Sequence, residues 1–190
     1  MITTTATKNS IYQQLRSHLA YLRLGAAAEA LPAELDRART EDLSHSAFLE
    51  RLLSIEVAAT EERRLNGRRR FACFPAPYRL EDFDFEAQPA VDRKLVDELA
   101  TLRFIEEASN VLLIGPPGVG KTMLALGLGQ KAVEAGYRVY FTTAADLAAR
   151  CRRAAIEGRW ATCMRFYAGP SLLLIDELGC APRGAGGPCG

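Results

Sequence analysis

Eight residues near the middle of the chain constrain its fold more than any other segment. Residues 115–122 read Gly-Pro-Pro-Gly-Val-Gly-Lys-Thr, which fits the pattern G-x-x-x-x-G-K-[ST]. An apolar run typical of a short buried strand, NVLLIG (residues 110–115), precedes them, and a helical pattern with Leu124, Leu128 and Val133 follows. This order predicts a loop whose backbone N–H groups, with the N-terminus of the next helix, face a polyphosphate.

The side chains of this loop have separate predicted roles. Lys121 is expected to reach the β- and γ-phosphates of a nucleotide, and the Thr122 hydroxyl to ligate Mg²⁺. The alternative is a glycine-rich turn that binds nothing, which the position between strand and helix disfavours. The candidate nucleotide-binding residues are Gly115, Pro116, Pro117, Gly118, Val119, Gly120, Lys121 and Thr122.

A second apolar run ends in two acids. Residues 172–176 read LLLID, and Glu177 follows directly. In a parallel sheet, ligands collect at the carboxyl ends of strands, so Asp176 is expected near the phosphate loop, where it would hold Mg²⁺. Glu177 is then the candidate general base for an attacking water, with Lys121 as the other candidate catalytic residue. A strand that merely stops at two solvated acids is the alternative.

The remaining pattern of this half predicts an α/β fold. A helix is expected from Val91 to Leu102, another after Lys121 as far as Gly136, a strand at residues 138–143 and a helix at residues 144–158. Strands that alternate with helices of this length indicate a parallel sheet. Trp160, Phe166 and Tyr167 follow at helical spacing, and we expect them in the core.

The front of the chain predicts a small helical module over residues 1–70. One helix is expected around residues 11–22, before Gly25 and Pro32 disturb the pattern, and a second from about Ser46 to Arg64 with Ser44 or Ser46 as its N-cap. Residues 71–90 contain Pro75, Pro77 and the acidic, aromatic run LEDFDF, and they predict an extended linker.

Charge and composition narrow the function classes. The 190 residues carry 24 Lys plus Arg against 23 Asp plus Glu, and 48% are hydrophobic, which excludes a wholly disordered chain and a highly charged tail protein. No apolar run is long enough for a membrane span, and the five scattered cysteines indicate neither disulfides nor zinc, so we expect a cytoplasmic protein. One basic cluster could contact DNA phosphates or could simply be a solvated helix end. It comprises Arg63, Arg64, Arg68, Arg69 and Arg70.

From about Tyr12 to Gly179 the sequence resembles the IstB-like ATP-binding proteins, transposition helpers of bacterial insertion sequences that are similar to DnaC-type helicase loaders within the AAA+ ATPases. The linker FPAP and LEDFDF, the block QPAVDRKLVDELATLRFIEEASNVLLIGPPGVGKT, FTTAADL and LLLIDELG carry the resemblance. It implies a P-loop NTPase of three α/β/α layers over residues 91–179, with ATP and Mg²⁺ as cofactors. It also implies self-association on DNA and recruitment of a cognate transposase.

The sequence departs from that family after Gly179, where only CAPRGAGGPCG follows. The resemblance implies further strands, one of them between the strand before Gly115 and the strand ending at Asp176. We therefore expect an incomplete sheet with unpaired backbone, a Gly/Pro-rich tail over residues 180–190, and impaired ATP hydrolysis. Three alternatives stay open at this point: a transposition helper, a replicative helicase loader, and an inactive truncated remnant.

Overall fold

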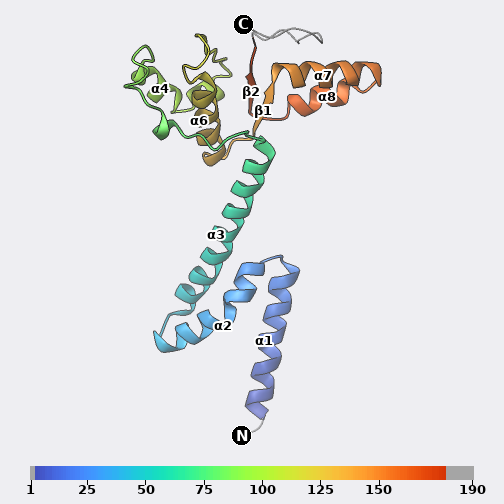
Figure 1. The fold of residues 1–190 in the computed structure, drawn as a ribbon. Coiled ribbons are helices and arrows are strands. Elements are labelled where there is room, and N and C mark those ends of the chain that lie inside the picture. Colours follow the sequence, from blue (N-terminus) through green and yellow to red (C-terminus); the bar gives the residue numbers. More distant parts are fainter. Residues whose placement is uncertain (1–2, 179–190) are drawn as a thin grey trace. The chain divides into compact units, whose positions relative to one another are not determined.

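The computed structural model describes residues 3–178, with side chains from residue 10 onward. The described residues form two compact units that meet between Arg64 and Leu65, and this division falls inside one long helix, α3 (His45–Ala72; Figure 1). The predicted tail at residues 180–190 lies outside the described residues. Among residues 3–178, no helix combines the length and the hydropathy that spanning a bilayer requires.

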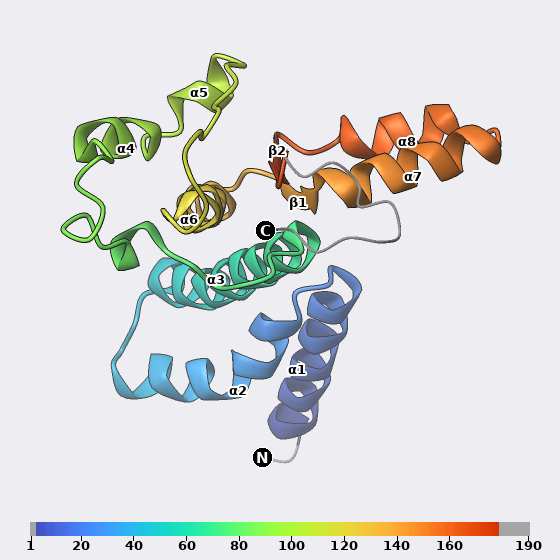
Figure 2. The same ribbon diagram turned by 45° about the horizontal axis from the view of Figure 1, so that its top comes forward.

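The first unit contains two further helices, α1 (Thr3–Tyr21) and α2 (Gly25–Thr40), which lie side by side (Figure 2). The predicted helix at residues 11–22 is part of α1, but α2 was not predicted. Pro32 lies inside α2, where its missing N–H removes one backbone hydrogen bond. The helix continues because Ala27 and Leu31 are fully buried in a core with Leu19 and Leu52.

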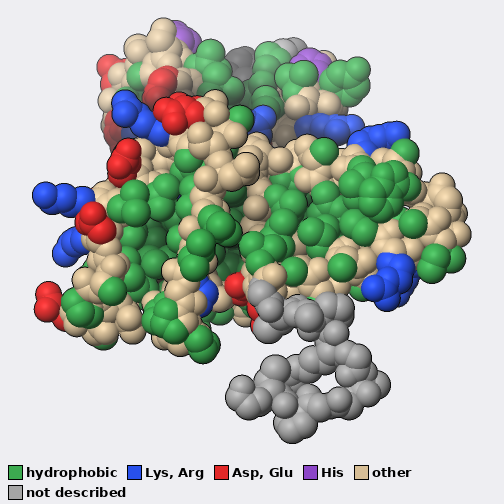
Figure 3. Space-filling view, turned by 90° about the horizontal axis from the view of Figure 1, so that it is seen from above, with side chains coloured by type: hydrophobic (Ala, Val, Ile, Leu, Met, Phe, Trp, Pro, Cys, Tyr) green, Lys and Arg blue, Asp and Glu red, His purple; other side chains and the backbone are tan. Residues whose placement is uncertain are grey.

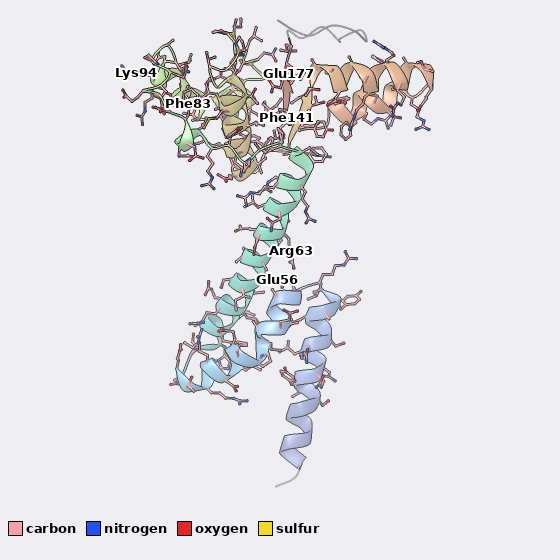
Figure 4. The ribbon with its side chains drawn as sticks, in the orientation of Figure 1. Glu56, Arg63, Phe83, Lys94, Phe141 and Glu177 are labelled. Carbon is pink, nitrogen blue, oxygen red and sulfur yellow. The ribbon has the colours of Figure 1, made fainter. Side chains whose placement is uncertain are left out.

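A buried acid of α3 joins α3 to α2. Glu56 is 5% exposed, and its Oε2 accepts the backbone N–H of Ala27 at 3.0 Å, in the first turn of α2. Its Oε1 accepts a hydrogen bond from Arg63 at 2.7 Å (Figure 4). The Ala27 hydrogen bond, followed by that of Arg63, lowers the pKa of Glu56. A carboxylate of one helix thus satisfies an orphan N–H group of another.

Helix α3 begins as predicted and ends later than predicted. Ser44 is its N-cap, because Ser44 Oγ accepts the backbone N–H of Ala47 at 3.2 Å. The helix continues past Arg64 to Ala72, where Cys73 adopts a left-handed φ of 54°. The extension is explained by packing, since Ala72 is fully buried in the core of the second unit.

The second unit is built around α6 and a small parallel sheet. Strand β1 (Val139–Thr143) pairs with β2 (Leu172–Asp176), with Val139 opposite Leu172 and Thr143 opposite Asp176. Both strands were predicted, and the α/β class is confirmed. The helices are α4 (Arg93–Leu99), α5 (Arg103–Glu106), α6 (Lys121–Glu134), α7 (Ala144–Ile156) and α8 (Trp160–Tyr167), together with the short 3₁₀ helix η1 (Leu80–Asp82).

Helices α7 and α8 connect β1 to β2 in the chain and pack against each other as a hairpin to one side of the paired strands (Figure 1). The prediction that all three aromatic residues of α8 lie in the core is wrong for two of them. Tyr167 is 8% exposed, but Trp160 is 50% and Phe166 39% exposed. Phe166 packs edge-on against Tyr140 of β1, with ring centroids 4.9 Å apart, and against Phe71 and Tyr167, yet part of its side chain remains accessible.

The strand predicted at residues 110–115 is not formed in the described structure. Its backbone pairs with no strand among residues 3–178, and Val111, Leu112 and Ile114 are 38%, 65% and 85% exposed. Only Leu113 packs inward, against the core that contains Phe83 and Leu124. An apolar run becomes a strand only where a neighbour pairs with its backbone, and none is present here. The expectation of unpaired backbone beside this segment is confirmed.

A groove of about 860 Å³ separates this segment from β2. Leu112 and Ile114 line one side, Leu172 and Leu174 the other, and Leu128 of α6 contributes to its apolar lining. Figure 3 shows that hydrophobic side chains gather on the face seen from above, and Leu112 and Ile114 are among the exposed large apolar residues. A free strand edge beside exposed apolar side chains is a template for association with another chain.

We predict that the 190-residue chain self-associates through this groove. Charged side chains oppose edge pairing, so Leu112→Lys together with Ile114→Lys is expected to shift sedimentation velocity profiles from large species toward the monomer. Ile156→Lys on α7 is the matched control, because Ile156 is 81% exposed and lies outside the groove. Equal relief by Ile156→Lys, or a monomeric parent at micromolar concentration, would contradict the prediction.

Candidate phosphate-binding site

The loop before α6 has the backbone conformation that the glycine pattern predicts. Gly118 has a φ of 82° and Gly120 a φ of 87°, both in the left-handed region that favours glycine. Gly120 is the N-cap of α6, and its carbonyl accepts the backbone N–H of Leu124 at 2.9 Å. The loop therefore turns directly into the N-terminus of α6, a helix of 14 residues whose free N–H groups favour an anion.

Lys121 folds back over the start of this loop. Its Nζ donates to the carbonyl oxygens of Gly115 at 2.9 Å and Pro116 at 2.7 Å. These bonds hold the ammonium group beside the loop backbone instead of letting it extend into solvent. Pro117, Gly118, Lys121 and Thr122 all line the groove described above.

The structure brings the second predicted element to the loop. Thr122 Oγ1 donates to Asp176 Oδ2 at 2.9 Å, so the two predicted magnesium ligands are in direct contact. The other carboxylate oxygen, Asp176 Oδ1, accepts the backbone N–H of Glu177 at 2.9 Å. A hydroxyl oxygen and a carboxylate oxygen are the hard ligands that Mg²⁺ takes, so these residues fit that ion.

Close packing of α6 on β2 explains this contact without the expected strand at residues 110–115. Gly129 of α6 lies so near β2 that a methyl group added there would be 2.6 Å from Leu174 Cδ1. Leu174 is two residues before Asp176 on β2, and Gly129 is seven residues, about two helical turns, after Thr122. Helix and strand therefore run together from this close approach to the Thr122–Asp176 hydrogen bond.

Glu177 lies at the end of β2 and borders the same groove (Figure 4). It is exposed, and its φ of 59° is left-handed, which is uncommon for a residue other than glycine. Such backbone conformations concentrate at functional sites. Glu177 thus follows Asp176 directly and lines the groove that Lys121 and Thr122 also line, and its role as a general base stays a prediction.

The basic cluster of α3 is largely engaged within the protein. Arg63 pairs with Glu56, Arg68 Nε donates to the carbonyl of Val133 at 3.0 Å, and Arg69 pairs with Glu134 at 3.1 Å. Arg68 and Arg69 thereby bind the C-terminal turn of α6, where cations are favourable. Arg70 Nε donates to the carbonyl of Asn66 of its own helix, at 3.4 Å. The Arg64 side chain makes no ion pair or hydrogen bond with any described residue.

Sequence reasoning missed the contribution of the linker. The run LEDFDF is not a free extended segment, because Phe83 is 7% exposed and packs with Val96 and Leu124. Its ring also contacts the phosphate loop, since a methyl group added at Gly120 would lie 2.6 Å from Phe83 Cε2. The spacing of Leu80, Phe83 and Phe85 was the signal that this segment packs.

The two left-handed glycines of the loop give a graded prediction. Gly118→Ala is expected to lower the free energy of unfolding by about 1–2 kcal/mol. The cost is backbone strain alone, because no atom lies within 4 Å of a methyl group added at Gly118. Gly120→Ala adds a clash with Phe83, so its cost is expected to be larger by about 1–3 kcal/mol. Urea unfolding followed by fluorescence of Trp160, the single tryptophan, measures both. Equal costs for the two variants would contradict the close contact of Phe83 with Gly120.

Comparison with known proteins bears on the same segments. The family model described as IstB-like ATP binding protein matches residues 17–185. Similar proteins include "Insertion sequence IS5376 putative ATP-binding protein" of Geobacillus stearothermophilus, 38% identical over 88% of this chain and 66% of its own length. The "Insertion sequence IS232 putative ATP-binding protein" of Bacillus thuringiensis subsp. berliner is 35% identical over 92% of this chain and 70% of its own length.

A third relative, "Insertion sequence IS21 putative ATP-binding protein" of Pseudomonas aeruginosa, is 38% identical over 89% of this chain and 64% of its own length. The chain thus spans about two thirds of the length of these relatives. The family model covers the helical front, the linker, the phosphate loop and the acids at the end of β2. On this match, the chain belongs to the family of IstB-like ATP binding proteins.

Proposed function

We propose that this chain binds ATP with Mg²⁺ at residues 115–122 and serves as an ATP-dependent helper of DNA transposition. The observation that carries the nucleotide proposal is the direct hydrogen bond between Thr122 and Asp176, at 2.9 Å, at the N-terminus of α6. It joins the loop and the acid that two separate sequence patterns singled out. The names of the relatives, which are ATP-binding proteins of insertion sequences, support the biological setting.

Each residue has a proposed role. The backbone N–H groups of residues 115–122 surround the phosphates, and Lys121 leaves the carbonyls of Gly115 and Pro116 to bind them. Thr122 and Asp176 hold Mg²⁺, which when bound neutralises charge on the phosphate oxygens. Glu177 orients a water and accepts its proton. Glu177→Gln then retains ATP affinity, while any turnover falls by about 10².

The proposed partners are DNA, a cognate transposase and further copies of this chain, in the cytoplasm. The support is the family membership together with the insertion-sequence names of the relatives. Of the five candidate DNA contacts, Arg64 and Arg70 are the least engaged among the described residues, because Arg63 and Arg69 pair with acids and Arg68 binds a carbonyl of another helix, whereas Arg70 contacts a carbonyl of its own helix at 3.4 Å. We therefore assign backbone phosphate contacts first to Arg64 and Arg70.

Nucleotide binding is tested by calorimetry with two variants. Charge-assisted hydrogen bonds contribute roughly 1.5–3 kcal/mol, so Lys121→Ala is expected to weaken ATP binding about ten- to a hundredfold, with or without Mg²⁺. Asp176→Asn is expected to bind ATP without Mg²⁺ as the parent does, but to lose much of the gain that Mg²⁺ gives.

Leu95→Ala serves as the control for these variants. Leu95 is 54% exposed and lies on α4, outside the groove. The ATP affinity of Leu95→Ala is therefore expected to equal that of the parent. An unchanged affinity in Lys121→Ala would contradict nucleotide binding by this loop. An unchanged Mg²⁺ dependence in Asp176→Asn would remove Asp176 from the metal site.

DNA binding is tested by its salt dependence. The slope of log K against log salt is negative, and each lost phosphate contact reduces its magnitude by about 0.9, so Arg64→Gln plus Arg70→Gln is expected to make it shallower by about 1.8. The loss of affinity is expected to be the same for unrelated DNA sequences. Arg152→Gln plus Arg153→Gln on α7 is the control pair. If only the control pair makes the slope shallower, the α3 cluster is a solvated helix end and DNA binds elsewhere.

A further inference from the structure

The linker segment Leu80–Phe85 packs against α6 at two glycines. A methyl group added at Gly127 would lie 2.9 Å from both the backbone N and Cδ2 of Leu80, and one added at Gly120 would lie 2.6 Å from Phe83 Cε2. Gly120 and Gly127 are seven residues apart, about two helical turns, so they lie on the same side of α6. The segment therefore runs along the helix and ends at the phosphate loop.

Phe83 is held firmly at this contact. Its side chain is 7% exposed and packs with Val96 and Leu124. Phe85 packs edge-on against it, with ring centroids 4.9 Å apart, and the Arg93 guanidinium lies 5.4 Å above the Phe85 ring. A ring enclosed in this way has little freedom to move away from Gly120.

Gly120 is a sensitive point of the loop. Its left-handed φ of 87° sets the direction in which the backbone enters α6, and therefore the direction of the N–H groups of Lys121 and Thr122. A ring pressed against Gly120 restricts this turn, while no atom of Phe83 belongs to the phosphate-binding pattern itself. Supporting contacts of this kind decide whether a binding loop has the required geometry before its ligand arrives.

We propose that Phe83 is a positioning residue for the phosphate loop: its contact with Gly120 holds the last peptide groups of the loop in the orientation that binds phosphate. This inference rests on the nucleotide binding proposed above. Loss of the Phe83 ring weakens binding of the phosphate chain itself. The weakening is therefore the same for ATP and for inorganic tripolyphosphate.

Phe74 provides a matched control, because it packs against the same helix, α6. Its ring presses on Gly129, where an added methyl group would lie 3.0 Å from Phe74 Cζ. Gly129 is in the body of α6, away from the phosphate loop. Phe74→Leu and Phe83→Leu both remove a ring that packs on a glycine of α6, but only Phe83→Leu removes it from the loop.

The experiment measures the affinity of both variants for ATP and for tripolyphosphate by calorimetry, at a temperature where Trp160 fluorescence shows each to be folded. Phe83→Leu is expected to bind both ligands roughly tenfold more weakly than the parent, while Phe74→Leu stays within about twofold. Phe83→Met covers the case in which Phe83→Leu does not fold. Its flexible side chain still reaches Gly120 but restrains it less, so an intermediate loss is expected for both ligands.

Three results would overturn the proposal. One is parental affinity in both Phe83 variants while Lys121→Ala weakens binding. Another is an equal loss in Phe74→Leu, which would make the effect one of general stability. The third is a loss for ATP but not for tripolyphosphate, which would mean that the ring acts on the nucleoside. If Lys121→Ala also binds both ligands as the parent does, nucleotide binding by this loop is wrong and the inference falls with it.

Discussion

The second unit depends on how closely other segments approach α6. Three of its glycines, at positions 120, 127 and 129, let Phe83, Leu80 and Leu174 reach the helix backbone. Larger residues at these positions would separate α6 from the linker on one side and from β2 on the other. The C-terminal turn of α6 is held as well, because Arg68 and Arg69 of α3 bind the Val133 carbonyl and the Glu134 carboxylate. The helix that begins at the phosphate loop is thus fixed along its whole length.

This packing explains why the candidate site is assembled although its sheet is small. In the expected arrangement, the strand before Gly115 and the strand ending at Asp176 belong to one sheet that sets their positions. Here the segment before Gly115 is unpaired among the described residues, yet Thr122 and Asp176 share a hydrogen bond. Contacts of side chains with the glycine backbone of α6 place Thr122 beside Asp176. The backbone hydrogen bonds of a continuous sheet were expected to do this.

The sequence predicted those features that depend on local pattern. The glycines of the loop, the α6 periodicity, the strands at residues 139–143 and 172–176 and the Ser44 cap all follow from residue type and spacing. Features that depend on distant partners were not predictable in this way. Helix α2 was not predicted because Pro32 disturbs its helical pattern. The burial of α2 against α1 and α3 outweighs the backbone hydrogen bond that Pro32 cannot make. The run NVLLIG has the pattern of a buried strand, but these six residues alone do not show whether another strand pairs with them.

Charge patterns were the least informative. The Arg-rich end of α3 reads as one basic surface, whereas the structure divides it by partner: Arg63 binds Glu56, Arg69 binds Glu134, and Arg64 stays unengaged among the described residues. These acids are distant in sequence or lie on another helix turn, so the pattern of arginines alone could not reveal them. For Phe83, the spacing with Leu80 and Phe85 could indicate that the segment packs, but not that it packs on Gly120, which is 37 residues away.

Hydrogen–deuterium exchange tests most directly whether packing on α6, rather than a paired strand before the loop, holds the site. Peptides covering residues 110–114 are predicted to exchange at nearly the unprotected rate. Those covering residues 124–133 of α6 and residues 139–143 of β1 are predicted to exchange at least on the order of 100-fold more slowly. Protection of residues 110–114 equal to that of β1 would show that this segment is a paired strand, and would contradict the account.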